Sequence, residues 1–214
     1  MKELLTDGLK ELGISGYEEK SELLYRYVGE LMLFNPALKL VGDRDEKGII
    51  IRHILDSASG YNVFLDCTKP GDTIADLGSG SGLPGIVLAS ILEDRDFVLV
   101  ERMQRRVGFL RGVVAKLKLH NVRVLDKDIR DIDERFSAIT CRAFHPLIDI
   151  AKDSVKLLDD DGVAIMYKGQ RKSVDSELGG LSTDYEFNAS CTALKVPFLN
   201  EERVMCVLSG WRKR

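Results

Sequence analysis

Residues 76–85, with the sequence DLGSGSGLPG, have the composition and spacing of a nucleotide-binding loop. They follow the apolar run 73–77, which predicts a buried parallel strand. Glycine tolerates positive φ and lets a ligand lie directly against the backbone, while Pro84 suits the first turn of a helix. A strand, a glycine turn and the free N–H groups of a helix start together predict a site for a nucleotide-type cofactor.

Two carboxylates flank this loop and narrow the choice of cofactor. Glu101 ends the second expected strand, where a carboxylate would accept hydrogen bonds from both ribose hydroxyls. Asp76 lies inside the first strand, which suits a cationic ligand better than a pyrophosphate. S-adenosylmethionine carries an ammonium and a sulfonium group, so the acids favour it, with Ser79, Gly80 and Gly82 as further contacts. A tight packing turn beside an incidental acid is the alternative interpretation.

Polar residues at two further strand ends would face the same crevice. Asp128 follows the expected strand 122–125 and could accept a hydrogen bond from an adenine amino group, although a solvated acidic turn is the alternative. Arg142 ends the next strand and is followed by Phe144, a combination that suits a substrate mouth. Cys141 lacks the Pro-Cys context of a pyrimidine C5 methyltransferase, and its side chain should point away from that of Arg142.

The elements that must position these residues change in kind along the chain. Residues 2–34 predict two helices, of which Asn35-Pro36 should stop the second, and residues 46–60 predict a third. From residue 72 onward strands alternate with helices. The expected strands are 73–77, 97–101, 122–125, 138–141 and 163–167, and the expected helices are 84–92, 103–118, 146–157 and 173–180.

These repeated strand–helix units imply an α/β fold with a parallel sheet, helices on both faces and a ligand at the carboxyl ends of the strands. The apolar-alternating runs 185–194 and 203–209 suit a terminal hairpin. Residues 211–214, Trp-Arg-Lys-Arg, are expected to form a frayed basic tail.

Composition limits the class of protein. With 214 residues, 44% of them apolar and 30% charged, the chain suits one soluble α/β domain with a short extension. Its four scattered cysteines form no CxxC and no metal-ligand spacing, so we expect reduced thiols and no metal. We see no signal peptide and no membrane span, and we expect a cytoplasmic protein.

The loop at 76–85 is similar to the cofactor loop of the RsmG (GidB) family, bacterial methyltransferases that modify N7 of a guanine in 16S ribosomal RNA. Further stretches fit the family in the same order and extend the resemblance over most of the chain. They are RHILDS at 52–57, RRVGFLR at 105–111, RAF at 142–144, YKG at 167–169 and ER at 202–203.

The resemblance implies a class I S-adenosylmethionine-dependent methyltransferase, Rossmann-like with a seven-stranded sheet and an N-terminal helical extension. We therefore divide the chain into a helical cap, 1–60, and a methyltransferase part, 61–214, of the same domain. Cofactor contacts of the family carry over to Gly78, Leu83, Ile129, Arg130 and Arg142. The chain departs from the family pattern at two places, residues 39–41 and 128–131. At 39–41, Lys-Leu-Val replaces Asn-Leu-Thr, although Asn35 keeps another family asparagine.

The implied reaction agrees with what the residues lack. Guanine N7 has an in-plane lone pair and no proton, so attack on the sulfonium methyl needs alignment but no general base. The fourth strand is not followed by the Asn/Asp-Pro-Pro-Tyr/Phe sequence that exocyclic-amine methyltransferases use. We expect Arg142 to position the substrate or the cofactor carboxylate, and Phe144 to stack on the guanine.

Binding of 16S rRNA within the small ribosomal subunit needs positive patches on a chain whose net charge is −3. We expect Arg52, His53, Phe144, Lys168 and Arg171 to contact the RNA, with Lys168 and Arg171 on the crevice side. Arginines at 102–111 fit a solvated helix face equally well. We expect a monomer.

Three alternatives stay open at this point. The first is a methyltransferase of the same fold that acts on another RNA, a protein or a small molecule. The second is an NAD-dependent oxidoreductase, which also uses a glycine loop and a ribose acid but is disfavoured by Asp76. The third is a non-catalytic RNA-binding module.

Overall fold

The computed structural model describes residues 1–142, 147–148 and 155–213. Its helices are α1 (Lys2–Glu11), α2 (Tyr17–Leu38), α3 (Glu46–Ile49), the π-helix η1 (Ile50–Leu55), α4 (Asp56–Ala58), α5 (Tyr61–Cys67), α6 (Gly85–Ile91), α7 (Gln104–Leu117) and α9 (Arg171–Leu181), with 3-10 turns η2 (Ile129–Asp131) and η3 (Val155–Leu157). Its strands are β1 (Thr73–Leu77), β2 (Asp96–Val100), β3 (Val122–Leu125), β4 (Phe136–Arg142), β5 (Leu158–Lys168), β6 (Tyr185–Ala193) and β7 (Val204–Lys213). None of the helices within these ranges is long and apolar enough to cross a membrane.

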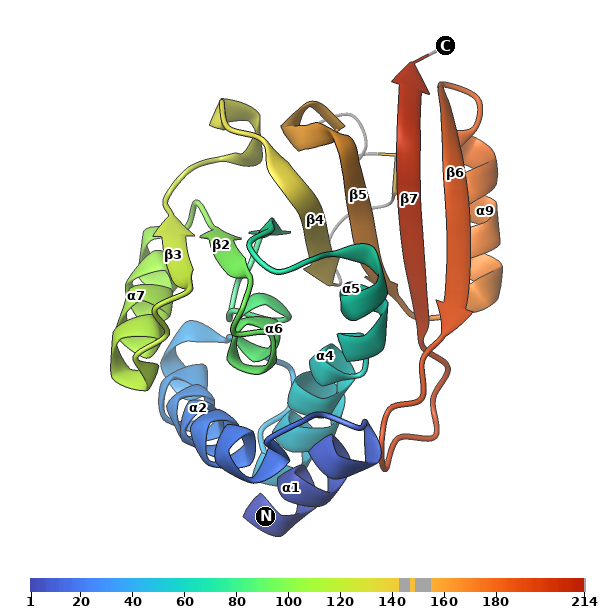
Figure 1. The fold of residues 1–214 in the computed structure, drawn as a ribbon. Coiled ribbons are helices and arrows are strands. Elements are labelled where there is room, and N and C mark those ends of the chain that lie inside the picture. Colours follow the sequence, from blue (N-terminus) through green and yellow to red (C-terminus); the bar gives the residue numbers. More distant parts are fainter. Residues whose placement is uncertain (143–146, 149–154, 214) are drawn as a thin grey trace.

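The strands form one seven-stranded sheet in the order β3-β2-β1-β4-β5-β7-β6 (Figure 1). The first five are parallel, whereas β7 is antiparallel to both β5 and β6. This arrangement confirms the predicted α/β fold and the antiparallel pairing of the last two strands. The parallel strands end at a common border, which we call the carboxyl edge.

Alternation along the strands divides the buried side chains between the two faces of the sheet. On β1, Ile74 joins a core cluster with the N-terminal helices, α6 and α7, whereas Ala75 joins a second cluster with α9. On β2, Phe97 belongs to the first cluster and Val98 to the second. Helices therefore cover both faces, and α9 lies beside β6 and β7 in Figure 1.

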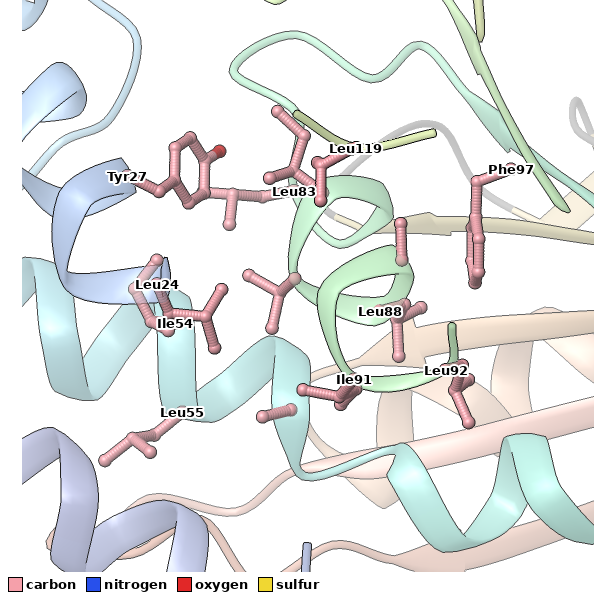
Figure 2. Close-up of a cluster of buried hydrophobic side chains, with 14 of the residues drawn as sticks. Leu24, Tyr27, Ile54, Leu55, Leu83, Leu88, Ile91, Leu92, Phe97 and Leu119 are labelled. Atoms are coloured by element: carbon pink, nitrogen blue, oxygen red, sulfur yellow. The ribbon is translucent and has the colours of Figure 1, made fainter. Parts of the chain in front are cut away.

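The helices at 1–60 pack directly on the sheet domain through this first cluster. Figure 2 shows Tyr27 beside Leu83, and Leu24 and Ile54 facing the side of α6 that carries Ile91. All five of these side chains are at most 5% exposed. Removing this much apolar surface from water gives the N-terminal helices a large share in the stability of the core.

The expectation that Asn35-Pro36 stops a helix is wrong, because α2 continues to Leu38. Pro36 lies in the last turn, where its missing N–H costs a single bond and the neighbouring residues are exposed. The helix ends at Lys39, which adopts a left-handed conformation and donates its N–H to the carbonyl of Asn35 at 2.9 Å.

Three other segments differ from or refine the predictions. The segment 46–60 is helical, as expected, but η1 widens its middle into a π-turn. Helix α5 was not predicted, although Phe64 provides it with a buried anchor. Residues 211–213 belong to β7 and are not a frayed tail, because the Trp211 ring packs against those of Tyr185 and Phe187. Most of the expected helix 146–157 lies outside the described residues.

Candidate functional site

The loop at 78–85, called the glycine loop below, crosses the carboxyl edge between β1 and α6. Gly78, Gly80 and Gly82 have φ values of +70°, +57° and +90°, a region that side chains with a Cβ rarely occupy. The N–H of Ser79 donates to the carbonyl of Val100 at 2.9 Å, which ties the loop to the neighbouring strand. The sequence pattern therefore folds into the glycine turn that it predicts, with Gly78 and Gly80 partly exposed and residues 81–85 buried.

Asp76 supports the loop from below. It is buried, and its Oδ2 accepts a hydrogen bond from the N–H of Gly85 at 3.0 Å, which joins β1 to the first turn of α6. Its Oδ1 is also buried and has no hydrogen-bond partner among the described residues. Burial raises the pKa of Asp76 to about 7, so a positive group beside Oδ1 would favour the ionised form.

Glu101 holds the other side of the loop. Its Oε2 accepts from the N–H of Gly80 at 3.0 Å, and its Oε1 accepts from the N–H groups of Arg102 and Met103, both at 2.8 Å. A carboxylate has about four acceptor positions, so these three bonds leave about one for a ribose hydroxyl. The sequence predicted a ligand contact here but not that Glu101 also fixes the loop.

Arg142 ends β4 on the face of the sheet that carries the N-terminal helices. Its guanidinium donates to the carboxylate of Asp56 at 2.9 Å and to the carbonyl of Arg52 at 3.0 Å, and it lies 3.0 Å from Nδ1 of His53. Cys141 faces the opposite cluster, as alternation predicts, and burial raises the pKa of its thiol to about 12. This thiol therefore has the character of a core residue and not that of a nucleophile.

Asp56 joins three distant segments, a role that sequence reasoning missed. It is buried, and it accepts hydrogen bonds from Arg142 and, at 3.0 Å, from Nε of Arg203. One residue from each of three family-like stretches, Asp56, Arg142 and Arg203, thus takes part in the same cluster. Their shared resemblance was the only sequence signal that could have linked them.

The pKa of His53 depends on the positive charge of Arg142. Burial, and then the positive charge of Arg142, lower the pKa of His53 to about 4, while Asp43 raises it. The unfolded chain binds this proton near pH 6.5, so His53 makes the fold less stable as the pH falls from about 6.5 to 4. We expect NMR titration of the ring to show a raised pKa in Arg142→Ala. The control Arg135→Ala, which only removes an exposed pair with Asp160, should leave it unchanged.

The cap reaches the glycine loop through Tyr27. This buried side chain donates its hydroxyl to the carbonyl of Ser81 at 2.5 Å (Figure 2 shows its position). Tyr27→Phe should leave that carbonyl unpaired and lower the free energy of unfolding by about 1–3 kcal/mol in urea titrations. Tyr61→Phe, whose hydroxyl has no partner in the described ranges, is the control. Equal stability of both variants would contradict a bracing role.

Asp128, Ile129 and Arg130 form the turn after β3 and face the same edge. Asp128 accepts hydrogen bonds from the backbone and side chain of Arg130, and these hold its pKa well below the usual range. Arg102 also lies within 3.3 Å. The carboxylate oxygens of Asp128 thus already accept hydrogen bonds from two arginines. The contact of Asp128 with an adenine amino group stays a prediction.

The basic residues predicted to bind RNA are paired within the chain. Arg52 donates to Glu201 at 2.6 Å, Lys168 to Glu177 at 2.7 Å and Arg171 to Asp175 at 3.1 Å. Lys168 points toward α9 and not toward the Arg142 side of the sheet, so the structure does not bring it together with the glycine loop. Phe144 lies outside the described residues.

Comparison with known sequences decides the family. A sequence model of the GidB family, described as rRNA small subunit methyltransferase G, matches residues 20–206. The chain belongs to this family. It is 31% identical to ribosomal RNA small subunit methyltransferase G of Treponema denticola, over 96% of this chain and 93% of that protein. The corresponding protein of Borrelia hermsii is 34% identical, over 82% and 84% of the two chains.

Solved structures support the fold. The ribosomal protein L11 methylase of Lactobacillus delbrueckii subsp. bulgaricus superposes with a TM-score of 0.56 at 13% identity, over 71% of this chain and 77% of that one. M. jannaschii TYW2, in complex with AdoMet, superposes with a TM-score of 0.52 at 14% identity, over 74% and 77%. The fold is therefore that of class I methyltransferases.

Proposed function

We propose that this protein transfers the methyl group of S-adenosylmethionine to N7 of a guanine in 16S rRNA of the small ribosomal subunit. The observation that carries the proposal is the convergence of the glycine loop, Glu101 and Arg142 at one edge of the sheet, in a chain of the rRNA small subunit methyltransferase G family. We further propose that it acts as a monomer in the cytoplasm.

The residues present fit S-adenosylmethionine. Gly78 and Gly80 adopt positive φ values and their backbone is partly exposed. Glu101 retains about one acceptor position for the ribose. The unpartnered Oδ1 of Asp76 would accept a hydrogen bond from the ammonium group or from water next to it. When bound, the cofactor supplies a methyl group on a positively charged sulfur.

The proposed reaction requires no general base among the side chains near Arg142. No proton has to be removed from guanine N7. Alignment of N7 with the methyl group and the sulfur can by itself lower the reaction barrier by about 7–11 kcal/mol. In this scheme Arg142 orients the substrate or the cofactor carboxylate, and Asp56 keeps the guanidinium in place. Cys141 packs on the opposite face of the sheet and takes no part in this scheme.

The decisive experiment is transfer of tritiated methyl groups to unmodified 16S rRNA and to 30S subunits, followed by mapping of the modified base. Labelling of a guanine at N7 is the expected result, whereas labelling of an adenine or cytosine would contradict it. Calorimetry with S-adenosylhomocysteine and NAD tests the cofactor separately. No finding supports the oxidoreductase alternative, and tight binding of NAD alone would revive it.

A further inference from the structure

Helices α2 and α7 pack side by side and run in opposite directions. Lys116 near the end of α7 contacts Glu30 and the side chain of Arg26, whereas Phe109, two turns earlier on α7, packs edge-on against Phe34 with ring centroids 5.6 Å apart. The start of α7 therefore meets the end of α2 (Figure 1 shows the two helices adjacent). Because α7 follows β2, this meeting point lies at the carboxyl edge.

Apolar and basic side chains are exposed together at this point. Leu33 is 67% exposed, Phe34 39% and Met103 51%. Met103 precedes the first turn of α7, which holds Arg105 and Arg106, and Phe34 packs on Phe109 one turn further along the same helix. We call Leu33, Phe34, Met103, Arg105 and Arg106 the α2–α7 rim. Exposed apolar side chains of this size, grouped beside positive charge, are typical of a binding surface.

One of the two rim arginines, Arg105, is available to a partner. In the part of the chain that the structure describes, Arg105 has no hydrogen bond and no ion pair, unlike the paired Arg52, Lys168 and Arg171. Residues 101–111 and 126–130 hold six Arg or Lys against three Asp or Glu, although the whole chain has a net charge of −3. Arg102, Arg106, Arg111 and Arg130 each lie within 4 Å of one of these acids, so the local excess of positive charge includes Arg105.

The rim borders the candidate cofactor site through Arg106. Arg106 lies 3.9 Å from the carboxylate of Glu101 and reaches over Gly80 of the glycine loop. At the end of α2, Asn35 donates to the carbonyl of Asp43, whose carboxylate lies 2.9 Å from His53 beside Arg142. The start of α7 therefore adjoins the candidate cofactor site.

We propose that the α2–α7 rim binds single-stranded RNA next to the methylated base. Arg105 and Arg106 would bind phosphates, and Phe34 would present its ring to an unstacked base, the pairing of charge and aromatic surface that single strands favour. The inference rests on the proposed RNA substrate. It replaces Lys168 and Arg171 as the main phosphate contacts.

The test compares two charge reversals on the same helix. Arg105→Glu should weaken binding of a labelled single-stranded oligoribonucleotide at least about tenfold and reduce the salt slope of log Kd by about one. Lys118→Glu, at the exposed far end of α7, should bind like wild type. Phe34→Leu keeps apolar contact with Phe109 and should weaken binding about tenfold with an unchanged salt slope. The affinity of all variants for S-adenosylhomocysteine should not change.

Wild-type RNA affinity in Arg105→Glu would overturn the proposal, as would equal losses in Arg105→Glu and Lys118→Glu. If Arg105→Glu methylates protein-free rRNA normally but fails on 30S subunits, the rim binds a ribosomal protein and the RNA assignment is wrong. Failure of the proposed function is separate. In that case wild type modifies another base or none, while Arg105→Glu still loses affinity for RNA.

Discussion

Replacing Arg142 with alanine is expected to lower kcat/KM for methyl transfer by about 10²-fold or more. The guanidinium is fixed by Asp56 and by the carbonyl of Arg52, so it meets a ligand without reorganisation. Losing one such fixed, charged donor at a reacting centre has effects of this size. Single-turnover kinetics and calorimetry with S-adenosylhomocysteine divide the loss between chemistry and cofactor binding.

Whether the loss appears in cofactor binding or in the chemical step identifies the ligand group that Arg142 contacts. A weaker affinity for S-adenosylhomocysteine means that Arg142 holds the cofactor carboxylate, and an unchanged affinity with reduced kcat means that it holds the substrate. Arg142→Lys keeps the charge but not the planar fork and should recover part of the activity. Wild-type rates and cofactor affinity in a folded Arg142→Ala would remove the arginine from the mechanism.

Replacing Gly85 with alanine should reduce affinity for S-adenosylhomocysteine by about 10²-fold and destabilise the fold by about 1–3 kcal/mol. An added Cβ would lie 2.3 Å from Leu99 and 2.7 Å from Oδ2 of Asp76. The start of α6 must then move away from β1, which breaks the hydrogen bond from Gly85 to Asp76 and displaces the glycine loop. Calorimetry and urea unfolding measure the two effects.

A second glycine provides the matched control. Gly108 lies in α7, and a Cβ there would meet nothing within 4 Å. Gly108→Ala should raise stability by about 0.5–1 kcal/mol and leave cofactor affinity unchanged. If Gly85→Ala binds S-adenosylhomocysteine like Gly108→Ala, close approach of α6 to β1 is not needed for the site.

Local patterns account for most of the predicted fold. Strands β1 and β3 have the predicted bounds, because an apolar run or a two-residue alternation depends only on neighbours in the sequence. The errors arose where a distant partner overrides local preference. Trp211 joins a strand because Tyr185 and Phe187 lie opposite it, and α2 passes Pro36 because the proline lies in its last turn.

The sequence by itself determined the glycine loop, the acids on both sides of it and the family, because these depend on residue types at short spacing. Only the tertiary structure decided which distant residues fix Arg142 and the glycine loop in place. Asp56 meets an arginine 86 residues away, and Tyr27 braces a loop 54 residues away. It also showed that some cations, like Lys168, are paired, whereas Arg105 has no partner among the described residues. Such contacts depend on which surfaces pack together, and that is a property of the folded core.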